Sequence, residues 1–198
     1  MSALTEAIFD AVKSLPEGGI VAPKEFLHLG SRAAIDQALT RLNREGLLMR
    51  VGRGAYVIPV TGRFGSRAPS TESVIQAMEE QSGETIVASG ATEANALGLT
   101  TQVPTREVFI TSGTSRILQI GSRVVELKHA PRWQLALGKR PAGMAVRALS
   151  WLGPEQSHSA LTALRKKLPA TEWDALRAFR AALPSWMSHA LGLIHHHG

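Results

Sequence analysis

The segment from Ser31 to Ile58 constrains the fold of this chain more than any other part of the sequence. Its first half has four apolar residues at positions i, i+3, i+4 and i+7, which predicts an amphipathic helix with one buried face. These residues are Ile35, Ala38, Leu39 and Leu42. Ser31 can cap the helix because its hydroxyl accepts from an amide of the first turn, and Gly46 suits a left-handed helix end. We therefore expect the helix to begin after Ser31 and to end before Gly46.

The opposite face of this predicted helix is polar, with short side chains near its start and basic ones near its end. It carries Ala33, Gln37, Thr40 and Arg44, flanked by Asp36 and Arg41. A helix that enters the major groove of DNA has this profile, because its N-terminal residues meet base edges and its later cations meet phosphates. The face therefore favours DNA contact, and the alternative is the solvated face of a structural helix.

Two short apolar runs follow the helix, and a cationic turn joins them. Leu48–Val51 and Ala55–Ile58 flank Gly52, Arg53 and Gly54, which predicts a β-hairpin with an arginine at its tip. A helix-turn-helix followed by such a hairpin is a winged helix, whose wing arginine normally reaches the DNA backbone or minor groove. The order of elements favours a winged-helix DNA-binding domain over a structural helix and hairpin with solvated arginines.

The composition is that of an ordinary globular protein with an excess of basic residues. The chain has 198 residues and a formal net charge of +6, which favours a polyanionic partner. No run of about 18 uncharged apolar residues exists, and the acidic start differs from a basic signal peptide, so we expect a cytoplasmic protein without a membrane partner. Because the chain contains no cysteine, disulfides, thiolate catalysis and cysteine-bound zinc are excluded.

The segment from Pro59 to Pro69 is rich in glycine, proline and arginine, and it predicts a linker. We therefore expect a winged helix-turn-helix DNA-binding domain over residues 1–60, a linker over 61–69 and a C-terminal effector domain over 70–198. The second domain shows a helix, a strand, a helix, three strands and then four proline-separated helices. This order predicts an α+β chain whose α/β C-terminal domain has a small, mostly antiparallel sheet and C-terminal helices. The aromatic residues expected in the core of those helices are Trp151, Trp173, Phe179 and Trp186.

The sequence contains no complete catalytic or metal-binding motif. Residues 86–90 and 109–113 both end in Ser-Gly but lack the lysine of a phosphate-binding loop. Gly121-Ser122 precedes a strand with Glu126, as in nucleotidyltransferases, yet Lys128 stands where the second metal-binding carboxylate is required. The histidines are scattered, and no HExxH or GxSxG occurs. We expect no enzyme activity, catalytic residue, metal or cofactor, while an enzyme whose site assembles only in space stays an alternative. The terminal HHHG is either a truncated tag or native sequence and carries no prediction.

A second group of basic residues lies along the predicted sheet of the C-terminal domain and just beyond it. Because side chains alternate between the two faces of a strand, several of these residues could share a face that meets an acidic partner or more DNA. The alternative is ordinary solvated charge. The group consists of Arg106, Arg116, Arg123, Lys128 and Arg132.

Two segments, SRAAIDQALTRLNREGLLMRVGRGAYV (31–57) and SGATEANALGLTTQVPTREVFITSG (89–113), resemble the AbiEi-type antitoxins of bacterial abortive-infection, type IV toxin–antitoxin pairs. The resemblance covers most of residues 5–155. It implies a winged helix that binds inverted repeats in double-stranded DNA upstream of its own operon and represses it. It also implies a C-terminal domain that neutralises a cognate nucleotidyltransferase-like toxin, directly or functionally.

The resemblance also implies which residues form the DNA face. They are Ser31, Arg32, Ala33, Gln37, Thr40, Arg41 and Arg44 on the helix, with Arg50 and Arg53 on the wing. The alternative hypothesis is a transcriptional regulator whose C-terminal domain senses a small molecule. A nucleotidyltransferase-like gene immediately downstream would favour the antitoxin, and a metabolic gene would favour the sensor.

Overall fold

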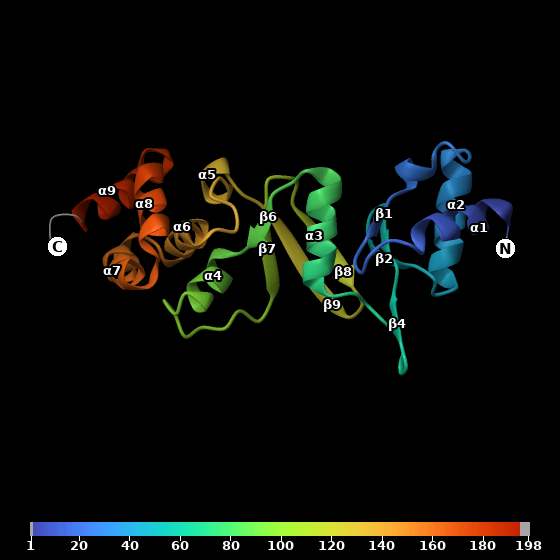
Figure 1. Ribbon diagram of the computed structural model, residues 1–198, viewed down its shortest axis with the longest axis horizontal. Helices are drawn as coiled ribbons and strands as arrows, with labels where there is room; N and C mark the ends of the chain where they lie inside the picture. Colours follow the sequence, from blue (N-terminus) through green and yellow to red (C-terminus); the bar gives the residue numbers. More distant parts are fainter. Residues whose placement is uncertain (1, 195–198) are drawn as a thin grey trace. The chain divides into compact units, whose positions relative to one another are not determined.

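The computed structural model describes residues 2–194 and forms two compact units (Figure 1). The first unit contains the chain up to Glu84 together with Arg116–Glu126, and the second contains Thr85–Ser115 and the chain from Leu127 onward. The predicted α+β class is confirmed, with small antiparallel sheets and C-terminal helices. The terminal HHHG lies outside the described residues. Among residues 2–194, no helix is both long enough and apolar enough to cross a bilayer.

The N-terminal part of the first unit packs two helices against a small sheet. The elements are α1 (Ala3–Val12), β1 (Ile20–Val21), η1 (Pro23–Phe26), α2 (Arg32–Arg44), β2 (Met49–Gly52) and β3 (Ala55–Val57). Helices α1 and α2 meet through Ile8, Ile35 and Leu39, each of which is fully buried. The predicted apolar stripe therefore faces the core, and the predicted ends of α2 are confirmed. The backbone N–H of Ala34 donates to Ser31 Oγ at 3.3 Å, and Gly46 has a φ of +74°.

Strands β1, β3 and β2 form an antiparallel sheet in that order. In β2 and β3, Gly52 pairs with Ala55, so Arg53 and Gly54 alone form the turn. The second turn residue, Gly54, has a φ of +65°, a conformation that favours glycine, whereas Arg53 does not have a positive φ. The predicted hairpin is therefore confirmed, and the order α1, β1, η1, α2, β2, β3 is compatible with a winged helix.

The segment predicted as a linker is mostly a second hairpin, formed by β4 (Val60–Gly62) and β5 (Gly65–Arg67). The first unit then continues into α3 (Thr71–Ser82), because side chains tie this helix to the N-terminal elements. The Glu17 carboxylate accepts from the backbone N–H of Ser70 at 3.1 Å, and the Gln81 amide donates to the Ile20 carbonyl at 3.4 Å. The compact units thus differ from the predicted division at 61–69, and the functional domain boundary stays a prediction.

Strand β8 (Arg116–Ile120) and the first part of β9 (Arg123–His129) complete the first unit. Strand β8 lies beside β2 of the hairpin, where Leu118 approaches Gly52. Strand β9 takes part in both units, in a four-stranded sheet of order β6-β7-β9-β8.

The second unit combines part of this sheet with a helical core. Its elements are β6 (Ile86–Ala88), α4 (Gly90–Ala96), β7 (Glu107–Thr111), α5 (Arg132–Leu135), α6 (Pro141–Leu152), η2 (Pro154–Gln156), α7 (Ser157–Lys167), α8 (Ala170–Ala178), η3 (Phe179–Ala182) and α9 (Ser185–Leu193). Helices α4 and α6 pack so closely that a Cβ on Gly90 would overlap the Arg147 carbonyl. Trp173 is buried, whereas Trp151 is 43% exposed. The prediction of a core position for Trp151 is therefore wrong, because this residue lies on the solvent side of α6.

Candidate nucleic-acid interface

The predicted DNA face of α2 and of its cap is exposed along its whole length. Ile35, Leu39 and Leu42 occupy the opposite side of the helix and are fully buried. The face also borders a shallow hollow of about 660 Å³. The exposed residues are Ser31, Arg32, Ala33, Gln37, Thr40, Arg41 and Arg44. All seven predicted helix residues are therefore exposed, and Gln37, Thr40, Arg41 and Arg44 line this one hollow, whereas Arg32 lines another.

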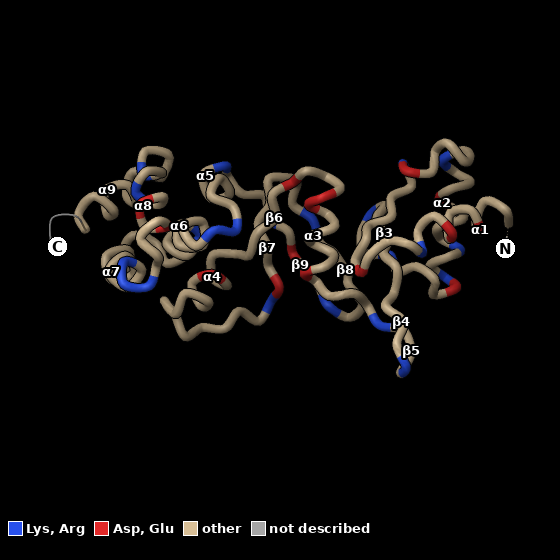
Figure 2. The backbone as a smooth tube through the Cα atoms, viewed as in Figure 1, with Lys and Arg blue, Asp and Glu red and all other residues tan. Residues whose placement is uncertain are grey.

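Two arginines of this surface form ion pairs within α2. Arg32 Nε lies 3.0 Å from an Asp36 carboxylate oxygen, and Arg41 Nε lies 2.9 Å from Glu45 Oε1. Exposed pairs at this spacing contribute only about 0.3–0.5 kcal/mol, so a phosphate can replace the carboxylate at small cost. Arg44 has no hydrogen-bond or ion-pair partner among residues 2–194. Basic and acidic residues along α2 are coloured in Figure 2.

The two hydroxyl groups of this surface already form hydrogen bonds with backbone groups of α2. Ser31 Oγ caps α2, and Thr40 Oγ1 donates to the Asp36 carbonyl at 2.7 Å. Thr40 can therefore accept from a base without breaking this bond, but it cannot donate. Gln37 is exposed and keeps both an amide donor and an acceptor, which is the combination that pairs with an adenine edge. The geometry thus makes Gln37 the best-equipped side chain for direct base contact.

The two predicted wing arginines are both exposed, and the fold positions each of them differently. The backbone N–H of Arg50 donates to Asn43 Oδ1 at 3.0 Å, and its Nε donates to the Gly52 carbonyl at 3.2 Å. Arg50 is therefore held along β2, close to the end of α2. Arg53 occupies the turn and, together with Arg32 at the start of α2, lines a hollow of about 440 Å³. The turn is thus not folded away from the helix.

This second hollow also contains basic residues that the sequence did not assign to the DNA face. Lys24 from η1 and Arg116 from β8 line it together with Arg32 and Arg53. We call it the η1–wing hollow. Lys24 is far from Arg53 in the sequence. No local pattern could place it beside the turn, because that proximity depends on tertiary packing.

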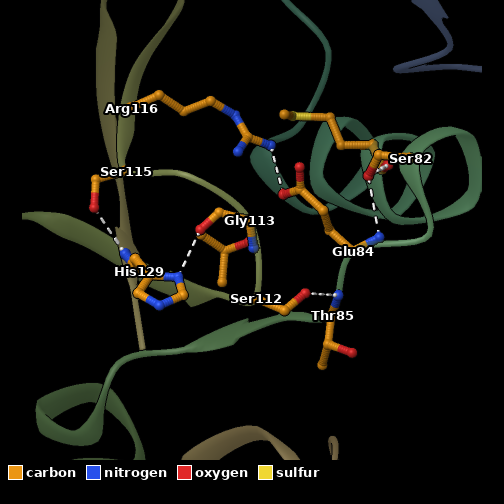
Figure 3. Close-up of polar contacts among 10 residues, drawn as sticks. Ser82, Glu84, Thr85, Ser112, Gly113, Ser115, Arg116 and His129 are labelled. Carbon is orange, nitrogen blue, oxygen red and sulfur yellow. Dashed lines mark hydrogen bonds and ion pairs between the residues drawn. The ribbon is translucent and has the colours of Figure 1, made fainter. Parts of the chain in front are cut away.

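The second predicted basic group is not gathered on one face. On β8, Arg116 lies on the same side as buried Leu118, and on β9 the half-buried Arg123 lies on the same side as buried Val125 and Leu127. Arg116 Nη2 lies 2.8 Å from Glu84 Oε2 (Figure 3), and Arg123 donates to the Pro69 carbonyl. Lys128 is five positions after Arg123, so it lies on the opposite face of β9. The strand members of the group therefore do not all share one face, and a partner-binding role for any of them stays a prediction.

The remaining two members of this group, Arg106 before β7 and Arg132 at the start of α5, are exposed in the second unit. His129 in the same unit has a local structural contact: its Nδ1 lies 2.8 Å from the Gly113 carbonyl oxygen (Figure 3). Among residues 2–194, no group of three or more His, Asp or Glu side chains is arranged to hold a metal ion.

The exposed polar face of α2 and the adjacent cationic turn make the first unit a candidate DNA-binding module. The chain belongs to DUF6088, a family of unknown function, whose family model matches residues 7–170. A comparison with curated proteins gives no match.

Proposed function

We propose that this protein is a DNA-binding antitoxin of a type IV, AbiE-like toxin–antitoxin system. Its first unit represses its own operon, and its C-terminal part neutralises a nucleotidyltransferase-like toxin. The observation that carries the DNA-binding half is the exposed face of α2, with Gln37 in its middle and Arg41 and Arg44 near its end. The antitoxin half is supported by the sequence resemblance over residues 5–155.

In this proposal α2 enters the major groove with its exposed face toward the bases. Gln37 contacts a base edge, since a carboxamide can pair with adenine through two hydrogen bonds. Arg41 exchanges Glu45 for a phosphate, and Arg44 contacts the same strand. Arg53 reaches the backbone beside the helix, as wing arginines do. Phosphate contacts fix position and the Gln37 contact supplies part of the sequence preference.

Repression follows from occupancy of the promoter. An inverted repeat presents the same half-site twice, related by a two-fold axis, so two copies of the first unit occupy one operator. Bound copies exclude polymerase from the promoter that drives their own synthesis, which links expression of the operon to the amount of free protein.

The test of DNA binding compares the wild type with Arg41→Ala and Arg53→Ala on DNA from upstream of the protein's own reading frame. Both variants are expected to weaken binding to all sequences, because each removes a phosphate contact. The plot of log affinity against log salt should become shallower by about one for each contact removed. Lys166→Ala, an exposed cation on α7, is the matched control. Wild-type affinity and slope in both arginine variants would reject the DNA-binding proposal.

The antitoxin half is tested by co-expression with the product of the gene immediately downstream. If that product resembles a nucleotidyltransferase and arrests growth, co-expression of this protein should restore growth. Arg41→Ala should restore growth as well as the wild type under an independent promoter, because DNA binding and neutralisation use different parts of the chain. Continued arrest with the wild-type chain would contradict the antitoxin assignment, and a metabolic gene downstream would favour a small-molecule sensor.

A further inference from the structure

The η1–wing hollow in the first unit has an apolar floor and a basic rim. Ile20 and Met78 lie on the floor and are 8% and 9% exposed. Lys24, Arg32, Arg53 and Arg116 supply the four cations, and none of the described residues that line the hollow is Asp or Glu. Cations around one space attract an anion to the extent that neighbouring carboxylates do not already pair with them. The composition of the lining therefore favours an anionic ligand.

The carboxylates nearest this rim already have partners. Asp36 pairs with Arg32, and Glu84 pairs with Arg116. Glu25 accepts from the Gln81 amide and, at 3.1 Å, from the backbone N–H of Ala22. By contrast, Lys24 and Arg53 have no hydrogen-bond or ion-pair partner among residues 2–194. Lys24 and Arg53 can therefore bind a ligand without breaking a hydrogen bond or ion pair among residues 2–194.

Local structure holds these two cations next to each other. Lys24 lies in η1, whose start is fixed by Pro23 and by the Glu25 contact to the Ala22 N–H. Arg53 is in the turn of the β2–β3 hairpin, and the neighbouring Gly54 lies against the Pro23 ring. Figure 3 shows Arg116 facing Glu84, which fixes the guanidinium on β8. The positions of these basic residues are therefore fixed by the fold in the absence of a ligand.

We propose that the η1–wing hollow binds a phosphate group, supplied either by a free phosphorylated molecule or by the DNA backbone. A phosphate offers several acceptor oxygens, which suit the planar fork of arginine and the point charge of lysine. The apolar floor accommodates the organic part attached to the phosphate. Because Arg32 and Arg53 also belong to the predicted DNA face, a free phosphorylated ligand competes with DNA for them. Only the DNA source of the phosphate rests on the proposed function.

The test titrates the full chain with inorganic phosphate at constant ionic strength. Binding is monitored through the NMR signals of the Gln81 side-chain amide and the Met78 methyl group. Saturable shifts of both signals are expected for a free phosphate. Lys24→Ala should weaken this binding about tenfold or more, since it removes a charge-assisted hydrogen bond. Lys166→Ala, on the second unit, should bind as the wild type does. Lys24 is exposed and has no described partner, so this substitution preserves the fold.

A second arm measures promoter binding by the same variants. If phosphate leaves the signals unmoved but Lys24→Ala makes the salt dependence of promoter binding shallower by about one, the DNA backbone is the source. If Lys24→Ala matches the wild type in both arms, the hollow is not a phosphate site and the proposal is overturned. Loss of promoter binding in Arg41→Ala but not in Lys24→Ala would then leave the proposed function standing. Phosphate binding without any promoter binding would support the hollow and contradict the proposed function.

Discussion

Arg147 of α6 shows how one residue organises the second unit. Its side chain is 0% exposed, and it donates to Glu93 Oε1 through Nη2 at 2.8 Å and through Nε at 3.3 Å. Its Nη1 donates to the carbonyl oxygens of Gly138, at 2.8 Å, and Gln134, at 3.3 Å. A buried guanidinium requires such partners because desolvation of an unpaired charge is costly. This residue therefore joins α4, α5, α6 and the segment after α5.

Arg147→Met is expected to destabilise the protein by about 3–5 kcal/mol, because it leaves the Glu93 carboxylate buried without its partner. The double variant Arg147→Met, Glu93→Gln should regain part of that loss, since it removes the uncompensated charge. Chemical denaturation of the three proteins measures both effects. A single variant within about 1 kcal/mol of the wild type would show that the pair is not a structural requirement.

Glu172 is the residue for which we expect a pH-dependent contribution to stability. Its hydrogen bond from Arg140 and, second, the backbone N–H of Ala142 lower the pKa of the carboxyl below its ordinary value of 4.5. A carboxyl with a lowered pKa in the folded state stabilises the protein above its unfolded pKa. This contribution is lost as pH falls through the folded pKa. Glu172→Gln should therefore lower Tm at pH 7, and the difference should shrink toward pH 3. An equal Tm difference at both pH values would contradict this.

At the scale of elements, the exposed face of α2 has one region suited to base contacts and another suited to phosphate contacts. Gln37 lies in the middle of the exposed face, while Arg41 and Arg44 lie in its last turn. Side chains in the middle can reach base edges, and those in the last turn can reach phosphates. Substitutions in the two regions should therefore change DNA binding in different ways.

Gln37→Ala is expected to cost roughly 1–3 kcal/mol on the cognate operator while leaving binding to unrelated DNA unchanged. Competition binding with operator and scrambled duplexes measures the ratio of the two affinities. The salt dependence should stay as in the wild type, because no phosphate contact is lost. An equal loss on both duplexes would show that Gln37 does not contribute to sequence preference.

At the scale of the whole molecule, local patterns predicted the elements but not the boundary of the first unit. The spacing of Ile35, Leu39 and Leu42 predicted α2, and the Gly-Arg-Gly turn predicted the hairpin, because both depend on neighbours along the chain. The contact between Glu17 and Ser70 joins residues far apart in sequence, and no periodicity encodes it. For the same reason the seven exposed residues of α2 and its cap could be predicted, whereas Lys24 and Arg116 at the η1–wing hollow could not.

The extent of the first unit also determines whether deletions or point variants should be used to test function. A deletion of residues 1–67 would cut between β5 and α3 and leave α3, β8 and the start of β9 without the N-terminal elements they pack against. Point variants on exposed side chains separate DNA binding from neutralisation without this damage. They are the appropriate tools for testing both halves of the proposal.

The salt dependence of promoter binding by Arg41→Ala tests whether the exposed face of α2 contacts DNA phosphates, as we propose. If the face contacts phosphates, the plot of log affinity against log salt for this variant is shallower than for the wild type by about one. A variant with the same affinity and the same slope as the wild type would contradict the claim.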